Sequence, residues 1–410
     1  MTAGSCRKAT GRAALWPSSA RCRRATARKW TPSWMSWGCK AGTEGSDDLM
    51  NMFSIQQMYF GLYEKCKKMM ISRYVRKVAK GYTSPSFQLT KEQKRQILEF
   101  YKPYAKINLA FHRFFTEKSG EFSPYYLPND MYINKVDEYF NNRTESQVMD
   151  NKCYYPMIFD RNGVKQAECV ALRMNGFWFT PEQQMLTKEE LERILNAEPA
   201  LFVKEATRSY GGKGVQYIER PANGDLFSLV MEKIHPNAGD IVVQKPLKQH
   251  PALAAFNPSS VNTIRVVTLL SKDGVKVYSS VLKTGEKGSK VDNGTSGGMT
   301  VGITGDGKLR KYARKVSGEQ FDRHPASGVV FENYELPCFD AVLELVKKAH
   351  PLVPHFRLVS WDVAVDENGD AVLIEANLAK GSINLHQLNN GPLFGEDTKK
   401  ILDEVFGKNK

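Results

Sequence analysis

A polar β-hairpin near the C-terminus constrains this chain more than any other feature. Residues 361–377 read WDVAVDENGDAVLIEAN, with aliphatic residues alternating on both sides of the Asn-Gly pair at 368–369. Asn-Gly in this setting predicts a two-residue type I′ turn. Such a turn would place Asp362 directly opposite Glu375, and Asn377 would share their face because side chains alternate with a period of two.

The polar face of this hairpin requires a compensating charge, because like charges opposite each other destabilise a sheet. Two carboxylates and an amide oxygen are hard ligands, and Mg²⁺ commonly binds through one or two carboxylates together with substrate phosphates. The pattern therefore indicates a magnesium site. The alternative is a solvated hairpin whose polar side faces water and whose aliphatic side packs, the aliphatic residues being Val363, Val365, Val372 and Ile374.

The composition is that of a soluble globular protein with two or three domains: 410 residues, 41% hydrophobic and 25% charged. The net charge of +14 is uneven, because residues 1–49 contain nine basic and only three acidic residues. We expect this segment to be a disordered basic extension outside the fold. A tail that binds an acidic partner is the alternative reading.

The rest of the composition excludes several classes of protein. The four cysteines after residue 49 lack the spacing of a zinc site. No apolar run approaches the ~20 residues of a membrane span. We therefore expect a cytoplasmic protein with reduced thiols. We expect no nucleic-acid partner, because the excess of positive charge is concentrated in residues 1–49.

Helical patterns dominate residues 50–150, which we expect to form a mainly helical N-terminal region. Residues 50 to about 80 predict a basic amphipathic helix that packs on its own domain, with a membrane surface or a partner as the alternatives. Thr90 and Gln93 have the spacing of a capping box, and Thr187 and Glu190 repeat it further along the chain.

Three strand-like segments between residues 151 and 246 carry residues suited to a phosphate-rich ligand. Lys204 lies on the first, and a glycine-rich turn follows before the second. Such a turn offers backbone N–H groups at close approach, although most turns of this kind are plain hairpins. The third ends in a hinge, QKPL at 244–247, where free backbone groups would meet an adenine edge.

The order of these parts, a lysine strand, a glycine loop, a hinge strand and a D…E-x-N hairpin, resembles the ATP-grasp superfamily. With SSVNTIRVVTL, VDNGTSGGM and HPASG, the chain is most similar to the sugar-transfer-associated ATP-grasp family, a relative of the alpha-L-glutamate ligases. The resemblance implies an α+β fold, in which two α+β lobes, residues 151–246 and 247–410, clasp ATP between antiparallel sheets.

The resemblance also implies roles for individual residues. It makes Asp362, Glu375 and Asn377 the magnesium ligands and places two lysines at the phosphates of ATP. The remaining assignments are Lys152 and Lys204 as those lysines, Gly211, Gly212 and Gly214 as a mobile lid loop, Gln244, Lys245 and Leu247 at the adenine, and Lys380 and Ser382 as substrate contacts.

One position departs from the family pattern. Several superfamily members carry an arginine two residues before the metal aspartate, and Ser360 stands there in this chain. Arg265 would supply the missing charge, with Lys283 beside it. A two-residue Asp-Gly turn would put these two cations on opposite faces, whereas a three-residue loop at 272–274 would put them on one face, and we predict the latter.

The implied activity is that of an ADP-forming ligase that joins a carboxylate to an amine through an acylphosphate, with ATP and Mg²⁺ as cofactors. The carboxylate would be a small molecule or linked to a sugar. The resemblance alone also implies a role in the assembly of surface polysaccharides or sugar conjugates. The alternatives are a phosphotransferase on the same ATP site and a basic scaffold that binds membranes or polyanions.

Overall fold

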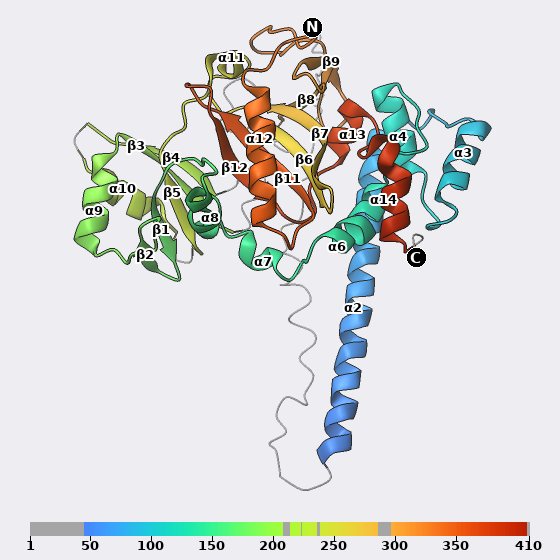
Figure 1. Cartoon of the computed structure of the whole chain (residues 1–410), viewed down its shortest axis with the longest axis horizontal. Helices are drawn as coiled ribbons and strands as arrows, with labels where there is room; N and C mark the ends of the chain where they lie inside the picture. Colours follow the sequence, from blue (N-terminus) through green and yellow to red (C-terminus); the bar gives the residue numbers. More distant parts are fainter. Residues whose placement is uncertain (1–44, 208–213, 223, 236–237, 286–296, 408–410) are drawn as a thin grey trace, which may run out of the picture. The chain divides into compact units, whose positions relative to one another are not determined.

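The computed structural model describes residues 45–207, 214–222, 224–235, 238–285 and 297–407 (Figure 1). The chain divides into two compact units, residues 1–67 and 68–410. The described part of the first unit belongs to α2 (Gly45–Tyr82), a helix that continues into the second. The expectation of a disordered extension at residues 1–49 falls mostly on residues 1–44, which lie outside the described part of the chain.

The second part of α2 packs on a helical segment of the N-terminal region. Val75 and Ala79 are buried, and three polar contacts follow one edge of the helix. Lys68 pairs with Glu138 at 2.5 Å, Asn134 donates to Ser72 at 3.0 Å, and Arg76 donates to Asp130 at 2.7 Å. The partners on α2 ascend by four residues while those on the other segment descend by four, so the two helical segments run antiparallel.

The N-terminal region is helical, as expected. Thr90 caps α3 through a capping box with Gln93, as the sequence predicts. The helices of this region and the short ones that follow it are α3 (Lys91–Tyr101), α4 (Ala110–Ser119), α5 (Asn129–Met131), the π-helix η2 (Tyr132–Val136), α6 (Asp137–Phe140), α7 (Ser146–Met149), η3 (Lys152–Tyr154), α8 (Tyr155–Ile158) and η4 (Asp160–Asn162).

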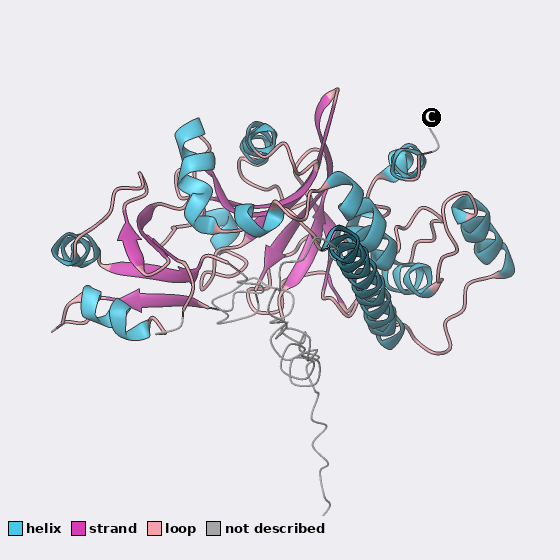
Figure 2. Ribbon diagram, turned by 90° about the horizontal axis from the view of Figure 1, so that it is seen from below, coloured by secondary structure: helices cyan, strands magenta, loops and turns pink. Residues whose placement is uncertain are grey.

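A five-stranded antiparallel sheet comes next, at the left of Figure 2. Its strand order is β2-β1-β5-β3-β4, and α9 begins at the predicted capping box of Thr187 and Glu190. The elements are β1 (Cys169–Met174), β2 (Phe177–Phe179), α9 (Lys188–Ala197), β3 (Ala200–Glu205), β4 (Val215–Glu219), α10 (Leu226–Lys233) and β5 (Ile241–Gln244).

The alternation of side chains gives this sheet two different faces. Leu201 and Val203 on β3 pack in one core with Leu195 of α9 and Val230 of α10. Phe202 and Lys204 project from the other face, which the helices leave open. The open face is therefore available for a ligand.

A seven-stranded antiparallel sheet forms the larger part of the chain, with strand order β10-β9-β8-β7-β6-β11-β12. Its strands are β6 (Thr263–Ser271), β7 (Gly274–Thr284), β8 (Met299–Ile303), β9 (Leu309–Arg314), β10 (Gln320–Phe321), β11 (Leu358–Val365) and β12 (Ala371–Asn377). The helices of this part are α11 (Pro251–Ala254), α12 (Phe339–Ala349), η7 (His350–Leu352), α13 (Asn384–Asn390), η8 (Gly395–Asp397) and α14 (Thr398–Val405).

The two faces of the large sheet also have different roles. Val266 and Trp361 belong to a core that includes Val346 of α12, which lies across the sheet in Figure 1. Val267 lies one residue from Val266 and Leu358 three residues from Trp361, so both face the other way, and they belong to a second core with α13, α14 and the N-terminal helices. Burying each large apolar side chain contributes roughly 1.5–3 kcal/mol, so both faces hold the sheet rigidly in place.

This architecture confirms the predicted fold: an α+β protein with antiparallel sheets and a helical N-terminal region. Among the described helices, none is long and apolar enough to cross a membrane.

Candidate active site

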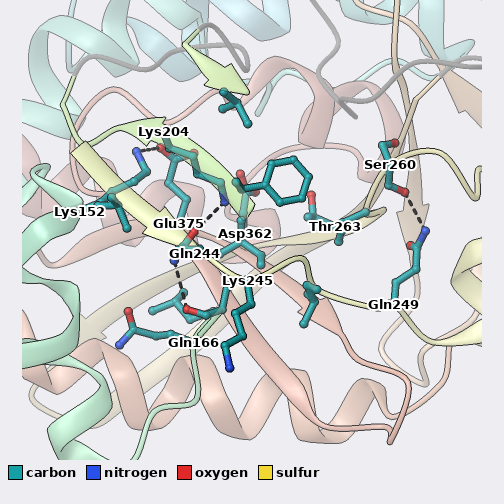
Figure 3. A pocket seen from close by; sticks show the side chains of 18 of the residues that line it. Lys152, Gln166, Lys204, Gln244, Lys245, Gln249, Ser260, Thr263, Asp362 and Glu375 are labelled. Carbon is teal, nitrogen blue, oxygen red and sulfur yellow. Dashed lines mark hydrogen bonds and ion pairs between the residues drawn. The ribbon is translucent and has the colours of Figure 1, made fainter. Parts of the chain in front are cut away.

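A pocket of about 590 Å³ lies between the open face of the small sheet and the end of the large sheet (Figure 3). This volume is in the usual range for a small-molecule site. The polar residues that line it are Lys152, Gln166, Lys204, Gln244, Lys245, Lys248, Gln249, Ser259, Ser260, Thr263, Lys283, Asp362 and Glu375.

The hairpin of β11 and β12 places its two carboxylates as the sequence predicts, because Asp362 pairs directly with Glu375. The predicted two-residue turn is wrong. Asp366 and Asp370 bond across a three-residue loop, in which Gly369 adopts a left-handed φ of 88°. The loop is therefore one residue longer than predicted, and a register shift between Asp362 and Val363 adds one residue to β12. These two changes cancel, so Asp362 still pairs with Glu375.

Arg265 and Lys283 reach Asp362 from the neighbouring strands β6 and β7. The Arg265 guanidinium binds the carboxylate with two bonds, Nε to Oδ1 at 2.7 Å and Nη2 to Oδ2 at 2.6 Å. Lys283 Nζ lies 3.3 Å from Oδ2. Burial opposes ionisation of Asp362, which is 3% exposed, but the two cations outweigh burial and hold its pKa well below the ordinary value.

Arg265 and Lys283 lie on one face of the sheet, as predicted. The loop that joins their strands is not the predicted one. Ser271 pairs with Gly274, so the loop has two residues instead of three. A register shift between Val267 and Thr268 then places Val281 opposite Arg265. Lys283 follows Val281 by two residues and therefore shares the face of Arg265.

Glu375 is held by a different cation. Lys152 Nζ lies 2.8 Å from its Oε1, so Lys152, on η3, reaches the β11–β12 hairpin from a separate part of the chain. Lys204 Nζ donates to Gln244 Oε1 at 2.8 Å across β3 and β5. Figure 3 shows both contacts as dashed lines among the side chains that line the pocket.

The loop that follows Asn377 is held by the N-terminal region. Asp137, which is fully buried, accepts a hydrogen bond from the Lys380 N–H at 2.8 Å and pairs with Arg143. Lys380 has a left-handed φ of 55°. A Cβ on Gly381 would lie 2.6 Å from Ser360 Oγ, so the loop passes tightly over β11. Ser382 is exposed.

The hinge, residues 244–247, offers a ligand its backbone groups, because the ammonium group of Lys245 is paired with two glutamates. Gln244, Lys245 and Leu247 all line the pocket. The Lys245 ammonium binds Glu168 and Glu198 at 2.6 and 3.1 Å, and its N–H donates to the Glu168 carbonyl. The Lys245 carbonyl and the Leu247 N–H have no hydrogen-bond partner among the described residues, which leaves one acceptor and one donor.

The glycine loop is only partly described. Gly214 has a left-handed φ of 76°, which favours glycine. Gly211 and Gly212 lie outside the described residues.

Sequence reasoning missed several residues of this site. Phe202, Val242 and Leu373 form apolar walls of the pocket. Phe202 could have been predicted from the sequence, because it precedes Lys204 by two residues on one strand and so shares its face. Asp137 gave no local signal, because its role depends on a loop 243 residues away. Asp150 does not line the pocket but interacts electrostatically with Lys152: burial raises the pKa of Asp150 to about 6, against the opposing charge of that lysine.

The residues present fit a magnesium ion that arrives with a phosphate ligand. Among the described residues, no cluster of three or more histidines, cysteines and carboxylates could hold a metal by itself. Two facing carboxylates suit Mg²⁺ when phosphate oxygens and water complete its six positions. The Asn377 amide donates its Nδ2 to the Ser360 carbonyl at 3.1 Å, which leaves its oxygen as the third donor.

Two antiparallel sheets around a pocket of lysines and facing carboxylates are the elements of an ATP-grasp protein. The chain matches the family described as "Sugar-transfer associated ATP-grasp" over residues 129–402, more than half of its length. It belongs to this family, which confirms the resemblance found in the sequence. Among curated proteins, none matched the chain in sequence.

Several solved structures are distantly similar. D-alanine–D-alanine ligase from Bacillus anthracis is 13% identical, with 65% of this chain and 69% of that chain covered and a TM-score of 0.37. D-alanyl-alanine synthetase A from Vibrio cholerae is 13% identical, with coverages of 64% and 65% and a TM-score of 0.38. Biotin carboxylase from Campylobacter jejuni is 12% identical, with coverages of 63% and 46% and a TM-score of 0.39. At these values the similarities do not bear on the activity of this chain.

Proposed function

We propose that this protein is an ATP-dependent carboxylate–amine ligase that forms a carbon–nitrogen bond and releases ADP. The observation that carries the proposal is the set of cations around two facing carboxylates at one pocket. Lys152, Lys204 and Lys283 line the pocket together with Asp362 and Glu375. Arg265 does not line the pocket but binds Asp362 from β6. Such a set of charges suits a triphosphate with its metal, because phosphoryl transfer asks the protein mainly for positioning and charge neutralisation.

The adenine would bind at the hinge. Phe202, Val242 and Leu373 offer apolar walls, while the Lys245 carbonyl and the Leu247 N–H offer one acceptor and one donor to the edge of the base. Lys152 and Lys204 would then face the phosphates. The family likeness supports ATP as the nucleotide.

The reaction would take place beside Arg265 and Lys283. Asp362, Glu375 and the Asn377 oxygen would hold Mg²⁺, which supplies charge neutralisation to the phosphate oxygens. A carboxylate oxygen of the substrate attacks the γ-phosphorus, and the bond to ADP breaks. Arg265 and Lys283 would stabilise the negative charge on the transferred group. The acceptor amine then attacks the acyl carbon, releasing phosphate, and the Lys380–Ser382 loop would contact it.

The family description supports a substrate linked to a sugar. We propose that either the carboxylate or the amine belongs to a sugar conjugate, within the assembly of surface polysaccharides.

Hydroxylamine tests the acylphosphate directly. The protein is incubated with ATP, Mg²⁺ and a panel of amino acids, uronic acids and their sugar conjugates, and hydroxamate and ADP are measured together. The ligase should form hydroxamate in proportion to the ADP released. Release of ADP with a phosphorylated acceptor and no hydroxamate would identify a phosphotransferase and refute the ligase.

Proton uptake tests the assignment of Lys204 to the phosphates. Burial, and then the charge of Lys152, lowers the pKa of the Lys204 ammonium to about 8. A triphosphate would raise that pKa, because it stabilises the charged form. ATP binding should therefore take up almost no proton at about pH 6 and close to one at about pH 9.

Calorimetry in buffers of different ionisation enthalpy measures this uptake. In the Lys204→Arg variant the side chain stays charged at both pH values, so its uptake should be absent. An uptake at high pH that survives in this variant would assign the proton to another group and remove Lys204 from the phosphate site.

A further inference from the structure

One side of α2 remains uncovered in the second unit. Val75 and Ala79 are buried, and the polar contacts of Lys68, Ser72 and Arg76 follow the same side. The opposite side carries Met69 and Met70, which are 46% and 58% exposed. It continues at helical spacing with three exposed cations, Arg73, Lys77 and Lys80.

The described part of α2 in the first unit is also exposed. Residues 57–67 are all exposed, and their large apolar side chains each show more than half of their surface. These side chains are Met58, Tyr59, Phe60, Leu62 and Tyr63. Single exposed apolar residues are ordinary, but a series of this length along one helix indicates a surface that binds something.

The charge of the helix identifies the kind of partner. Residues 57–82 contain seven basic residues and one acidic residue, Glu64. Lys65, Arg73, Lys77 and Lys80 have no carboxylate within ion-pair distance among the described residues. The partner must therefore be negatively charged and must also accept apolar side chains.

We propose that α2 binds an anionic lipid surface and lies in its plane. Tyrosine, methionine and leucine side chains would enter the boundary between headgroups and acyl chains, while lysine and arginine reach the lipid phosphates. A helix that cannot span the bilayer can still bind in this way.

Other occupants fit the observations less well. A second copy of the helix in a parallel pair would oppose Arg73, Lys77 and Lys80 to their own equivalents, which costs energy. The chain's own residues 1–49 are themselves basic, with nine basic and three acidic residues. A nucleic acid would neutralise the cations but would leave the methionines, the leucine and Phe60 in water.

Vesicle sedimentation of the full chain tests the proposal. Vesicles of equal parts phosphatidylglycerol and phosphatidylcholine should bind the protein, and vesicles of phosphatidylcholine alone should not. The variant Arg73→Gln/Lys77→Gln/Lys80→Gln should bind the anionic vesicles about a hundredfold more weakly, since each basic side chain is worth about fivefold. Leu62→Ser/Met69→Ser/Met70→Ser should also reduce binding.

A matched control separates a specific surface from general charge. Lys91, Lys102 and Lys106 are exposed outside α2, and their triple substitution by glutamine removes the same charge. It should leave vesicle binding within about threefold. Circular dichroism checks that each variant is folded.

Three results would overturn the proposal. The first is equal loss of binding in the control and the α2 charge variant. The second is binding to RNA that is tighter than to anionic vesicles and unchanged by the serine substitutions. The third is a dimer in sedimentation equilibrium, without lipid, that the serine substitutions abolish.

Discussion

Replacing Asp362 by asparagine is expected to abolish turnover and to destabilise the protein by about 3–5 kcal/mol. Asp362 is almost fully buried and is the common partner of Arg265 and Lys283. The amide cannot neutralise either cation, and removing one member of a buried ion pair leaves the other charge uncompensated. Turnover should fall by about a thousandfold or more, because the proposed metal loses a charged ligand. Thermal unfolding and ADP release measure the two effects.

The matched variant is Glu375→Gln on the facing strand. Glu375 is 30% exposed and pairs with Lys152, which is itself partly exposed. Its loss should reduce turnover as strongly while costing less than about 1 kcal/mol of stability, as is typical of ion pairs that reach solvent. A wild-type rate of turnover in either variant would remove that residue from the proposed metal site. Equal destabilisation by both would show that the burial of Asp362 does not decide its structural role.

The two hairpins show how far local sequence patterns determine the site. In each, the prediction paired the correct residues and gave the wrong loop length. The error at the turn of β11 and β12 is cancelled by a register shift beside Asp362, and a shift beside Val267 has the same effect in β6 and β7. The strands have one buried apolar face and one site face, and a slip of one residue would exchange them. Burial therefore determines the register, and the loop adjusts to it.

Contacts between distant segments could not be predicted in this way. Lys152 and Glu375 lie on different elements, and nothing in the residues around Lys152 specifies that it reaches the hairpin. The hydrogen bond from the Lys380 N–H to Asp137 could not be predicted from local sequence either. It depends on how the N-terminal helices pack against the end of β11. The family resemblance implied that Lys152 and Glu375 belong to one ATP site but did not pair them, and it implied nothing about Asp137. Tertiary packing, not local propensity, decides both.

Replacing Lys283 by methionine is expected to lower kcat by about 10²–10³-fold while leaving the affinity for ATP nearly unchanged. Arg265 holds Asp362 with two short bonds, whereas Lys283 is at 3.3 Å from the same carboxylate. The lysine can therefore be removed without releasing Asp362, and its charge is the more available one for a transferred phosphoryl group. Arg265→Met should reduce both activity and stability, because Arg265 makes the two short bonds of the buried ion pair with Asp362.

Lys276→Met provides the control on the same strand. Lys276 is exposed on β7 and pairs with Asp397, and neither residue lines the pocket. Its loss should change kcat by less than about threefold, because exposed pairs contribute little. ADP release gives kcat, and calorimetry with a non-hydrolysable ATP analogue gives the affinity. If Lys283→Met loses nucleotide affinity as much as kcat, then Lys283 binds the ground state. In that case the positive charge that replaces the arginine absent at Ser360 must come from Arg265 alone, and its pairing with Asp362 must open during the reaction.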